Sequence, residues 1–341
     1  MKTTKNAQIY VNTTSNKLNR IFGTLLMILL LAQSCSTSDD SDNDCDGPCN
    51  PPLAQEFANL RNTALEARTQ NFNFNAEDGN VTLTSANGVQ ININGNCLTL
   101  NGNPVTGNVD VEYVELFDKG SMLATNKPTM GELPNGDKAL LISGGEFFIE
   151  ATQNGNELET NCGLQLIIPS ALTGGTDAAM TLWEGVINAE GDLTWDEVDD
   201  ATGQGGVFGE GDQYYSLLEG FGWSNVDRFY SDPRPKTQIQ VQPPVGYNYT
   251  NSAVYLSYDG EDTGLAQLDT YDGTLNLFSE HYGQIPIGLE CHVIFVTEDD
   301  GVWRYAIKPV TIVADDIITF NLGETTVGTE ATLTALINGL P

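Results

Sequence analysis

Residues 72–95 read Phe-Asn-Phe-Asn-Ala-Glu-Asp-Gly-Asn-Val-Thr-Leu-Thr-Ser-Ala-Asn-Gly-Val-Gln-Ile-Asn-Ile-Asn-Gly. Apolar residues in this stretch alternate with Asn, Thr or Gln, which is the period-two pattern of a strand that buries one face. Asp-Gly and Asn-Gly pairs separate the runs, and such pairs favour the tight turns of β-hairpins. The stretch therefore predicts a meander of half-buried strands and an all-β fold.

Similar runs continue along the chain. They predict strands at residues 109–117, 139–142, 146–152 and 165–168, and a hairpin that turns at Gly191-Asp192. Because two sheets packed face to face bury such strands, we predict a first β-sandwich domain over residues 70–200. A second alternating series predicts a β-sandwich of immunoglobulin-like size over residues 233–341. Residues 201–232 are Gly-rich, acidic and then aromatic, and are predicted to connect the domains or to complete the first sheet.

Two segments carry apolar residues at helical spacing instead. Residues 53–69 follow Pro51-Pro52 and repeat apolar side chains every three or four positions, which predicts a short amphipathic helix. Near the other end, Thr329 is a predicted N-cap of a C-terminal helix. The apolar residues that would share one face of that helix are Leu333, Leu336, Ile337 and Leu340.

The first 35 residues have the pattern of an export signal. A basic flank that ends at Arg20 precedes the apolar run 21–32, and Gln33-Ser34-Cys35 follows. The run is too short to span a bilayer, which needs about 20 residues, but it fits the apolar core of a signal peptide. We predict a lipoprotein signal at residues 1–34 and a lipid anchor on Cys35. The alternative is an ordinary signal peptide cleaved near Ser34, with Cys35 free or in a disulfide.

Residues 35–52 are rich in Asp, Ser and Asn and are predicted to be an acidic tether. In this segment the chain resembles Bacteroidetes-type lipoproteins, in which acidic residues after the lipidated cysteine mark export to the cell surface. The motifs at residues 102–112, 141–155 and 222–230 resemble an uncharacterised group of these lipoproteins. The first domain also resembles ZU5-type β-sandwiches, which are interaction modules. The resemblance to the Bacteroidetes-type lipoproteins implies a lipid-anchored protein of the outer membrane that faces the cell exterior.

The chain is strongly acidic. Its 341 residues include 14 Lys+Arg and 46 Asp+Glu, and four of the basic residues lie within residues 1–34. The remaining 10 basic and 46 acidic side chains give a net charge of −36. This charge argues against nucleic acid as a partner, because binding to phosphate backbones needs a basic face. It is compatible with divalent cations and with neutral partners such as glycans.

Six cysteines are present, one of them the predicted lipidation site. An oxidising compartment permits disulfides, although sequence alone does not fix their connectivity. Cys45 and Cys49 flank Asp-Gly-Pro and are spaced to close a small loop in the tether. Cys97 and Cys162 both fall in the first predicted domain and form a candidate pair, which leaves Cys291 as a buried thiol. The chain lacks the Cys-x-x-Cys pairs and Cys/His clusters of a zinc site.

The acidic loops raise the question of calcium. Residues 42–47 match the first six positions of an EF-hand loop, but the twelfth position is Leu53 instead of a bidentate Glu. Three further acidic loops, at residues 196–200, 259–262 and 298–300, are more typical of solvated turns than of Ca²⁺ sites. We therefore predict no cofactor and no metal ligand, with Ca²⁺ as the alternative.

No catalytic residue is assigned from the sequence. His281 and His292 are the only histidines, and His292 lies in an apolar run that favours a structural role. Hydrolase and phosphate-loop motifs are absent from the sequence. Glycoside hydrolysis needs only two suitably placed carboxylates, so the abundant acidic residues leave it open. Among the aromatic residues, Trp195 is predicted to be exposed to a ligand, whereas core packing accounts for most of the others.

These observations predict a lipid-anchored, non-catalytic protein that acts by binding or in envelope assembly. Its partners would be the membrane, through the N-terminal lipid, and envelope proteins or a glycan. The first alternative is a glycan-binding accessory lipoprotein of an outer-membrane uptake system, and the second is a secreted hydrolase.

Overall fold

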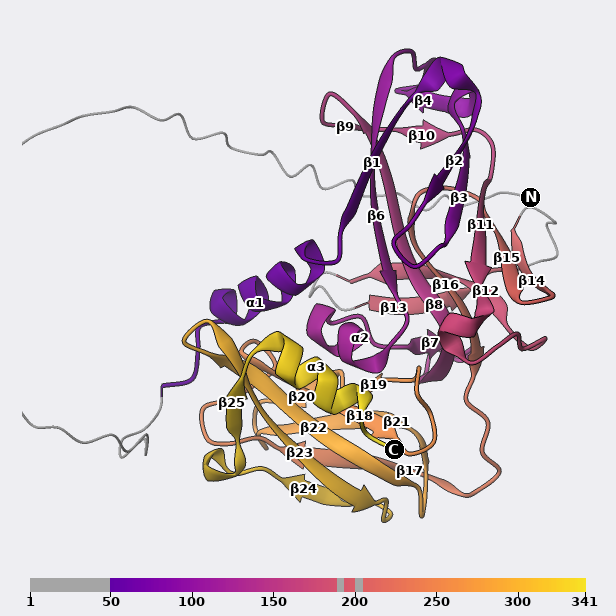
Figure 1. Ribbon diagram of the computed structural model, residues 1–341. Helices are drawn as coiled ribbons and strands as arrows, with labels where there is room; N and C mark the ends of the chain where they lie inside the picture. Colours follow the sequence, from indigo (N-terminus) through magenta and orange to yellow (C-terminus); the bar gives the residue numbers. More distant parts are fainter. Residues whose placement is uncertain (1–49, 189–192, 200–204) are drawn as a thin grey trace, which may run out of the picture. The chain divides into compact units, whose positions relative to one another are not determined.

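The computed structural model describes residues 50–188, 193–199 and 205–341 (Figure 1). The predicted signal peptide, the lipidation site Cys35, the cysteines Cys45 and Cys49, and most of the tether lie outside the described residues. The chain is all-β with a few helices, as the sequence predicts. The described residues form one compact unit.

The first part of the chain folds into two large sheets and a small one. The strand order of one large sheet is β1(Gln70–Asn75), β6(Asn108–Leu116), β8(Lys138–Gln153), β16(Gly222–Phe229), β12(Thr181–Ile187), β13(Leu193–Glu197) and β7(Met130–Glu132), with β9(Asn156–Glu157) on β8. The order of the other is β14(Gly206–Glu210), β15(Gln213–Leu218), β11(Leu164–Pro169), β3(Gln90–Asn94) and β2(Asn80–Thr84). The small sheet contains β10(Glu159–Thr160), β4(Leu98–Leu100) and β5(Asn103–Pro104). The two large sheets share one apolar core, which includes Ile91, Val111, Phe147, Leu166 and Tyr214.

One expectation about this sandwich is wrong. The two strands predicted at residues 139–142 and 146–152 are a single strand, because β8 runs through Gly144-Gly145 from Lys138 to Gln153. Of the two alternatives for residues 201–232, the structure has the second, because the described residues 205–232 supply β16 to the first sheet and β14 and β15 to the other large sheet. Strand β16 lies inside the first sheet, between β8 and β12, so this sandwich needs the aromatic segment to be complete.

Part of the first sheet closes on itself. Strand β7 pairs with both β8 and β13, so the strands β8, β16, β12, β13 and β7 form a ring. Closed rings bury their inward side chains in a tight interior. The interior of this ring contains Leu141, Trp183, Leu193 and Trp195, with Trp223 and Phe229 packed against them.

The second sandwich follows at residue 236. One of its sheets has the order β20(Thr270–Asp272), β21(Leu277–Pro286), β17(Lys236–Gln242) and β24(Ile317–Thr319). The other has the order β19(Ala266–Gln267), β18(Ser252–Tyr258), β22(Glu290–Asp299), β23(Val302–Thr311) and β25(Thr326–Gly328). Their shared core includes Val241, Leu256, Phe278, Val293 and Phe295.

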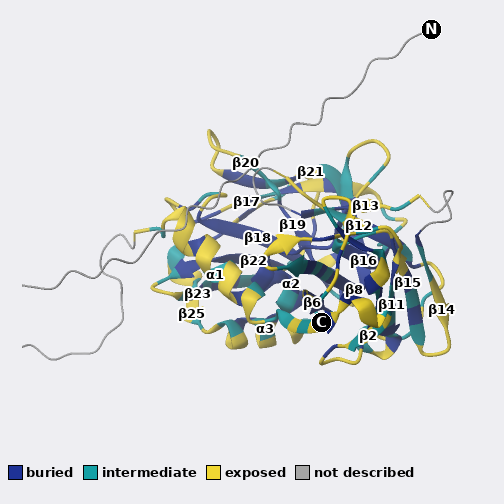
Figure 2. Cartoon of the chain, turned by 90° about the horizontal axis from the view of Figure 1, so that it is seen from above, coloured by how far each residue is buried: buried dark blue, intermediate teal, exposed yellow. Residues whose placement is uncertain are grey.

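A helical layer covers the outer face of the β18–β22 sheet. It consists of α1(Ala54–Glu66), α2(Lys119–Thr125) and α3(Glu330–Asn338), and α2 packs against both other helices (Figure 1). Strands β18 and β22 are consequently buried on both faces, although their alternation predicts only one buried face (Figure 2). Apolar residues of β6, of the helices and of β18 and β22 share this second layer of core: Val114, Phe57, Leu123, Ile337, Tyr255 and Ile294.

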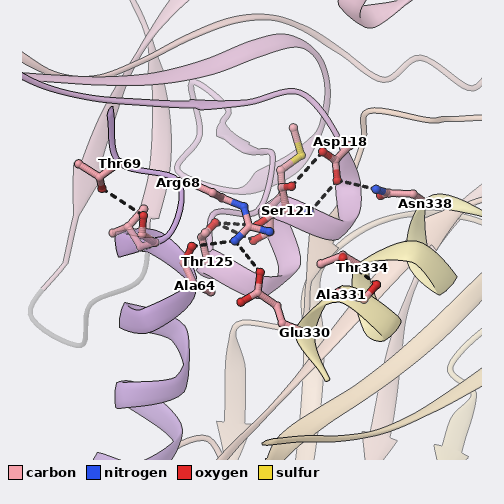
Figure 3. Close-up of polar contacts among 12 residues, drawn as sticks. Ala64, Arg68, Thr69, Asp118, Ser121, Thr125, Glu330, Ala331, Thr334 and Asn338 are labelled. Atoms are coloured by element: carbon pink, nitrogen blue, oxygen red, sulfur yellow. Dashed lines mark hydrogen bonds and ion pairs between the residues drawn. The ribbon is translucent and has the colours of Figure 1, made fainter. Parts of the chain in front are cut away.

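The structure confirms the predicted helices α1 and α3, and it adds α2. Thr329 caps α3, because its side chain accepts a hydrogen bond from the Thr332 N–H. Asp118 caps α2 by accepting a hydrogen bond from the Ser121 N–H, and it also accepts one from the Asn338 side chain of α3 (Figure 3). The two helices approach closely at Gly120, where an added Cβ would lie 2.7 Å from the Thr334 carbonyl oxygen.

Candidate functional site

The cysteines within the described residues have the states that the sequence favours. Cys97 and Cys162 form a disulfide with a Cα–Cα distance of 5.7 Å, which confirms the candidate pair. Cys291 is a buried free thiol, and burial raises its pKa to about 12. A thiol with such a pKa carries almost no thiolate near neutral pH, so Cys291 is not a nucleophile there.

The prediction that Trp195 faces a ligand is wrong. Its side chain is fully buried inside the closed ring of strands, and its Nε1 atom donates a hydrogen bond to the Pro128 carbonyl oxygen at 3.0 Å. The indole ring of Trp195 also packs edge-on against that of Trp223. The parallel pairing of β13 with β7 turns Trp195 inward, and this long-range pairing leaves no local signal in the sequence.

Each histidine has a hydrogen-bonding partner. His292 Nδ1 lies 2.8 Å from Asp259 Oδ1, and the ring is mostly buried, as expected of a structural histidine. His281 is exposed, its Nδ1 lies 2.8 Å from Thr270 Oγ1, and its ring packs against Tyr282.

Two buried carboxyl groups lie on neighbouring strands of the first sheet. Glu146 of β8 and Asp227 of β16 are both completely buried. Asp227 Oδ2 accepts a hydrogen bond from Asn225 Nδ2 at 2.6 Å. Burial raises the pKa of both carboxyl groups well above the ordinary values, and the nearby Asp227 adds to the shift at Glu146. Because solvent reaches neither group, this pair does not form a cleft in which a glycosidic bond would be held.

The acidic loops are engaged in local contacts. Asp299 pairs with Arg304 at 2.7 Å, and Glu298 accepts a hydrogen bond from the Gly301 N–H. Across the described ranges, no group of three or more His, Cys, Asp or Glu side chains is arranged to hold a metal ion. The EF-hand-like segment at residues 42–47 falls outside those ranges. The described helices also include none long and apolar enough to cross a membrane.

One hollow, of 860 Å³, lies between the start of α1 and the β22–β23 turn. Its charged side chains are the carboxylates of Glu56 and of the 298–300 loop. Glu56 accepts a hydrogen bond from the Leu53 N–H at 2.7 Å, so it closes the first turn of α1. Glu56, Glu298 and Asp299 are thus each engaged in a local contact.

A second pocket, of 430 Å³, has a richer chemistry. Its walls come from α1, from the end of α2, and from the second sandwich around β18, β19 and β21. Its volume falls within the range of small-molecule sites, roughly 300–1,000 Å³. The side chains that define its chemistry are Phe57, Arg61, Asn126, Lys127, Tyr249, Gln267 and Asp269.

The α1 wall presents a cation supported by neutral groups. The guanidinium of Arg61 lies 4.0 Å from the centre of the Phe57 ring, and its Nη2 donates a hydrogen bond to the Tyr255 hydroxyl at 3.1 Å. Tyr255 in turn donates to the Asn126 side-chain oxygen. Asn126 ends α2 in the left-handed conformation with φ 55°, which Asn tolerates better than most residues. The chain fixes this side chain through both its backbone and its hydrogen bond.

The opposite wall carries an acceptor and an aromatic ring. Asp269 Oδ2 lies 2.8 Å from Lys138 Nζ and accepts a hydrogen bond from the Tyr282 hydroxyl at 2.9 Å. Burial raises the pKa of Tyr282, so its hydroxyl keeps the proton that it donates. Tyr249 is 61% exposed, and its ring lies 5.9 Å from that of Tyr271.

The pocket therefore combines amide, carboxylate and cationic groups with an exposed tyrosine ring. Amide and charged side chains bond the hydroxyl groups of a polar ligand, and aromatic rings cover its apolar faces. No protein-family model and no curated protein matches this chain. The functional argument therefore rests on these residues.

Sequence reasoning missed this pocket because its parts are far apart in the chain. Arg61, Asn126, Tyr249 and Asp269 come from four separate segments, and only the packing of the helical layer on the second sandwich brings them together. The local signal in this region is the amphipathic pattern of α1. This pattern predicts that one face of the helix is buried, but it does not predict that other residues of the helix line a pocket.

Proposed function

We propose that this protein is a non-catalytic binding protein, lipid-anchored at the outer membrane and facing the cell exterior, and that its 430 Å³ pocket binds a segment of a glycan. The observation that carries the proposal is the pocket's combination of an exposed tyrosine with amide, cationic and carboxylate side chains. The signal-like residues 1–35, the acidic segment after Cys35 and the net charge support the location. A surface lipoprotein that holds a glycan fits an accessory role in uptake.

The binding test uses the full chain, purified from membranes in detergent, and a panel of neutral and acidic oligosaccharides. Tyr249→Ala is expected to weaken glycan binding about three- to tenfold, because it removes a ring that packs on a sugar face. Phe208→Ala is the matched control, because Phe208 is a similarly exposed aromatic residue (49%) outside the pocket. Equal loss in both variants, or no binding to any glycan, would contradict the proposal.

The anchor is tested separately. Metabolic labelling with an alkynyl fatty acid is expected to tag the wild-type chain and not Cys35→Ser, and the variant should partition into the aqueous phase. Surface exposure predicts that protease added to intact cells degrades the anchored protein. An unlabelled wild-type chain would favour the alternative of an ordinary cleaved signal peptide.

One surface feature favours envelope assembly as a second candidate function. Strand β14 ends the strand order of its sheet in the described part of the chain, and sheet edges accept further strands. On this edge the exposed Phe208 ring stacks on Tyr215 at a centroid distance of 5.1 Å, and Leu217 is also exposed. Crosslinking on intact cells tests this candidate, because Phe208→Asp should abolish crosslinks to an envelope protein while glycan binding persists.

A further inference from the structure

The acidic chain pairs most of its few cations with carboxylates. Residues 50–341 contain ten Lys and Arg side chains, all within the described ranges. At least six of them lie within 4.0 Å of an Asp or Glu: Arg68, Lys138, Arg228, Arg234, Arg304 and Lys308. A cation in this protein that lacks such a partner is therefore an exception with a local cause.

Arg61 is one of the exceptions, and it lines the candidate pocket. Among the described residues its guanidinium contacts the neutral Phe57 ring and the Tyr255 hydroxyl, and it takes part in no ion pair with them. Its Nε atom is buried without a hydrogen-bond acceptor. A partly desolvated guanidinium without an anion is costly, and an anionic ligand group that approaches its outer nitrogens offsets that cost.

Lys127 also lines the pocket but is only 8% exposed. Its Nζ donates a hydrogen bond to the Thr125 carbonyl oxygen at 3.4 Å and lies 5.2 Å from the centre of the Trp223 ring. The carboxylate among the lining residues is Asp269, and its Oδ2 is already held by Lys138 and Tyr282. Arg61 thus presents a positive charge to the pocket in a protein whose residues 35–341 carry a net charge of −36.

We propose that the ligand of this pocket is a glycan that carries a carboxylate-bearing sugar, and that Arg61 binds the carboxylate. This inference rests on the proposed glycan-binding function. The guanidinium fork matches the two oxygens of a carboxylate. A mostly neutral glycan with one acidic sugar fits better than a polyanion, because the surrounding acidic surface repels a chain of like charges.

The test compares oligosaccharides that contain a single uronate with their methyl esters, which keep the ring and remove the charge. The wild-type protein is expected to bind an acid about ten- to hundredfold more tightly than its ester, the usual effect of a charged hydrogen bond. Arg61→Gln should abolish this preference, and Arg61→Lys should keep part of it, since Lys retains the charge but loses the fork. Lys236→Gln, outside the pocket, is the control and should leave the preference unchanged.

The outcomes separate the two proposals. Equal affinity for acid and ester, or preference for neutral glycans, overturns the carboxylate inference and leaves glycan binding intact. Binding to no member of the panel overturns both. The comparison of acid with ester in the wild-type protein needs no variant, so misfolding of Arg61→Gln, which its thermal unfolding would reveal, does not spoil the test.

Discussion

The Nη1 atom of Arg68 lies 2.7 Å from Oε1 of Glu330, although the two residues are 262 positions apart in the chain. Arg68 follows the end of α1 and Glu330 begins α3, so the pair ties the first helix to the last (Figure 3). Arg68 Nη1 also donates a hydrogen bond to the Ala64 carbonyl oxygen at 2.7 Å. This hydrogen bond to Ala64 holds the Arg68 guanidinium in place at the end of α1.

We predict a measurable coupling between these two side chains. A double-mutant cycle with Arg68→Ala and Glu330→Ala should give about 0.5–1 kcal/mol in the free energy of unfolding, because both groups are only partly exposed. The pair Lys308–Glu324 is a more exposed control and should couple less strongly. A larger coupling in the control than in Arg68–Glu330 would contradict the prediction.

The Cys97–Cys162 disulfide is expected to contribute substantially to stability. It links residues 65 positions apart, and cross-links of this length stabilise by about 2–4 kcal/mol, chiefly by constraining the unfolded chain. The variant in which both cysteines are replaced by Ser should unfold at a lower temperature than the oxidised wild-type protein. Reductant should lower the wild-type unfolding temperature and leave that of the double variant unchanged.

Glu280 is expected to make stability fall as the pH rises. Its carboxyl group accepts hydrogen bonds from the N–H groups of Gly283 and Gln284, but burial raises its pKa from 4.5 to about 7. Between these two pH values the folded chain holds a proton that the unfolded chain has released. The contribution to stability is therefore present below pH 4.5 and is lost as the pH rises through 7, by up to about 3 kcal/mol.

Chemical denaturation of Glu280→Gln at several pH values tests this assignment. The variant lacks the ionisable group, so its stability relative to wild type should improve between pH 4.5 and pH 8. Parallel stability curves for the two proteins would show that Glu280 does not titrate in this window.

The closed ring of strands should tolerate no added methyl group at Gly185. A Cβ there would lie 2.5 Å from the Trp223 Cβ and 2.9 Å from the Leu193 Cδ1. Gly185→Ala is expected to lower the free energy of unfolding by about 1–3 kcal/mol, because a packed interior resists added volume. Gly220→Ala is the control, since a Cβ there meets nothing within 4 Å, and it should be near neutral. Equal effects of the two substitutions would rule out overpacking as the cause.

The sequence predicts the elements whose pattern is local. Alternation places most of the strands, and helical spacing places α1 and α3. Helix α2 escapes prediction because Lys119–Thr125 has seven residues, too few to show a helical repeat. Strand β8 continues through Gly144-Gly145 because pairing with β6 and β16 outweighs the turn preference of two glycines.

Burial is harder to predict than strand position. The sequence suggests an exposed Trp195, but the pairing of β13 with β7 closes the ring around it. The same limit applies to the pocket, whose cation, amide and carboxylate meet only after the helical layer packs on the second sandwich. Sequence reasoning therefore reached the fold class and the disulfide but not the candidate binding site.

Helix α1 lines the pocket and is also the first helix after the predicted tether. In an anchored protein, any mechanical load between the cell and a captured polymer enters the fold through this helix. Packing of Phe57 on Trp303 and the Arg68–Glu330 pair resist its detachment. A ligand bound between α1 and the second sandwich would contact both and so add to these two interactions. Ligand binding would therefore strengthen the attachment of α1 to the fold when the protein is under load.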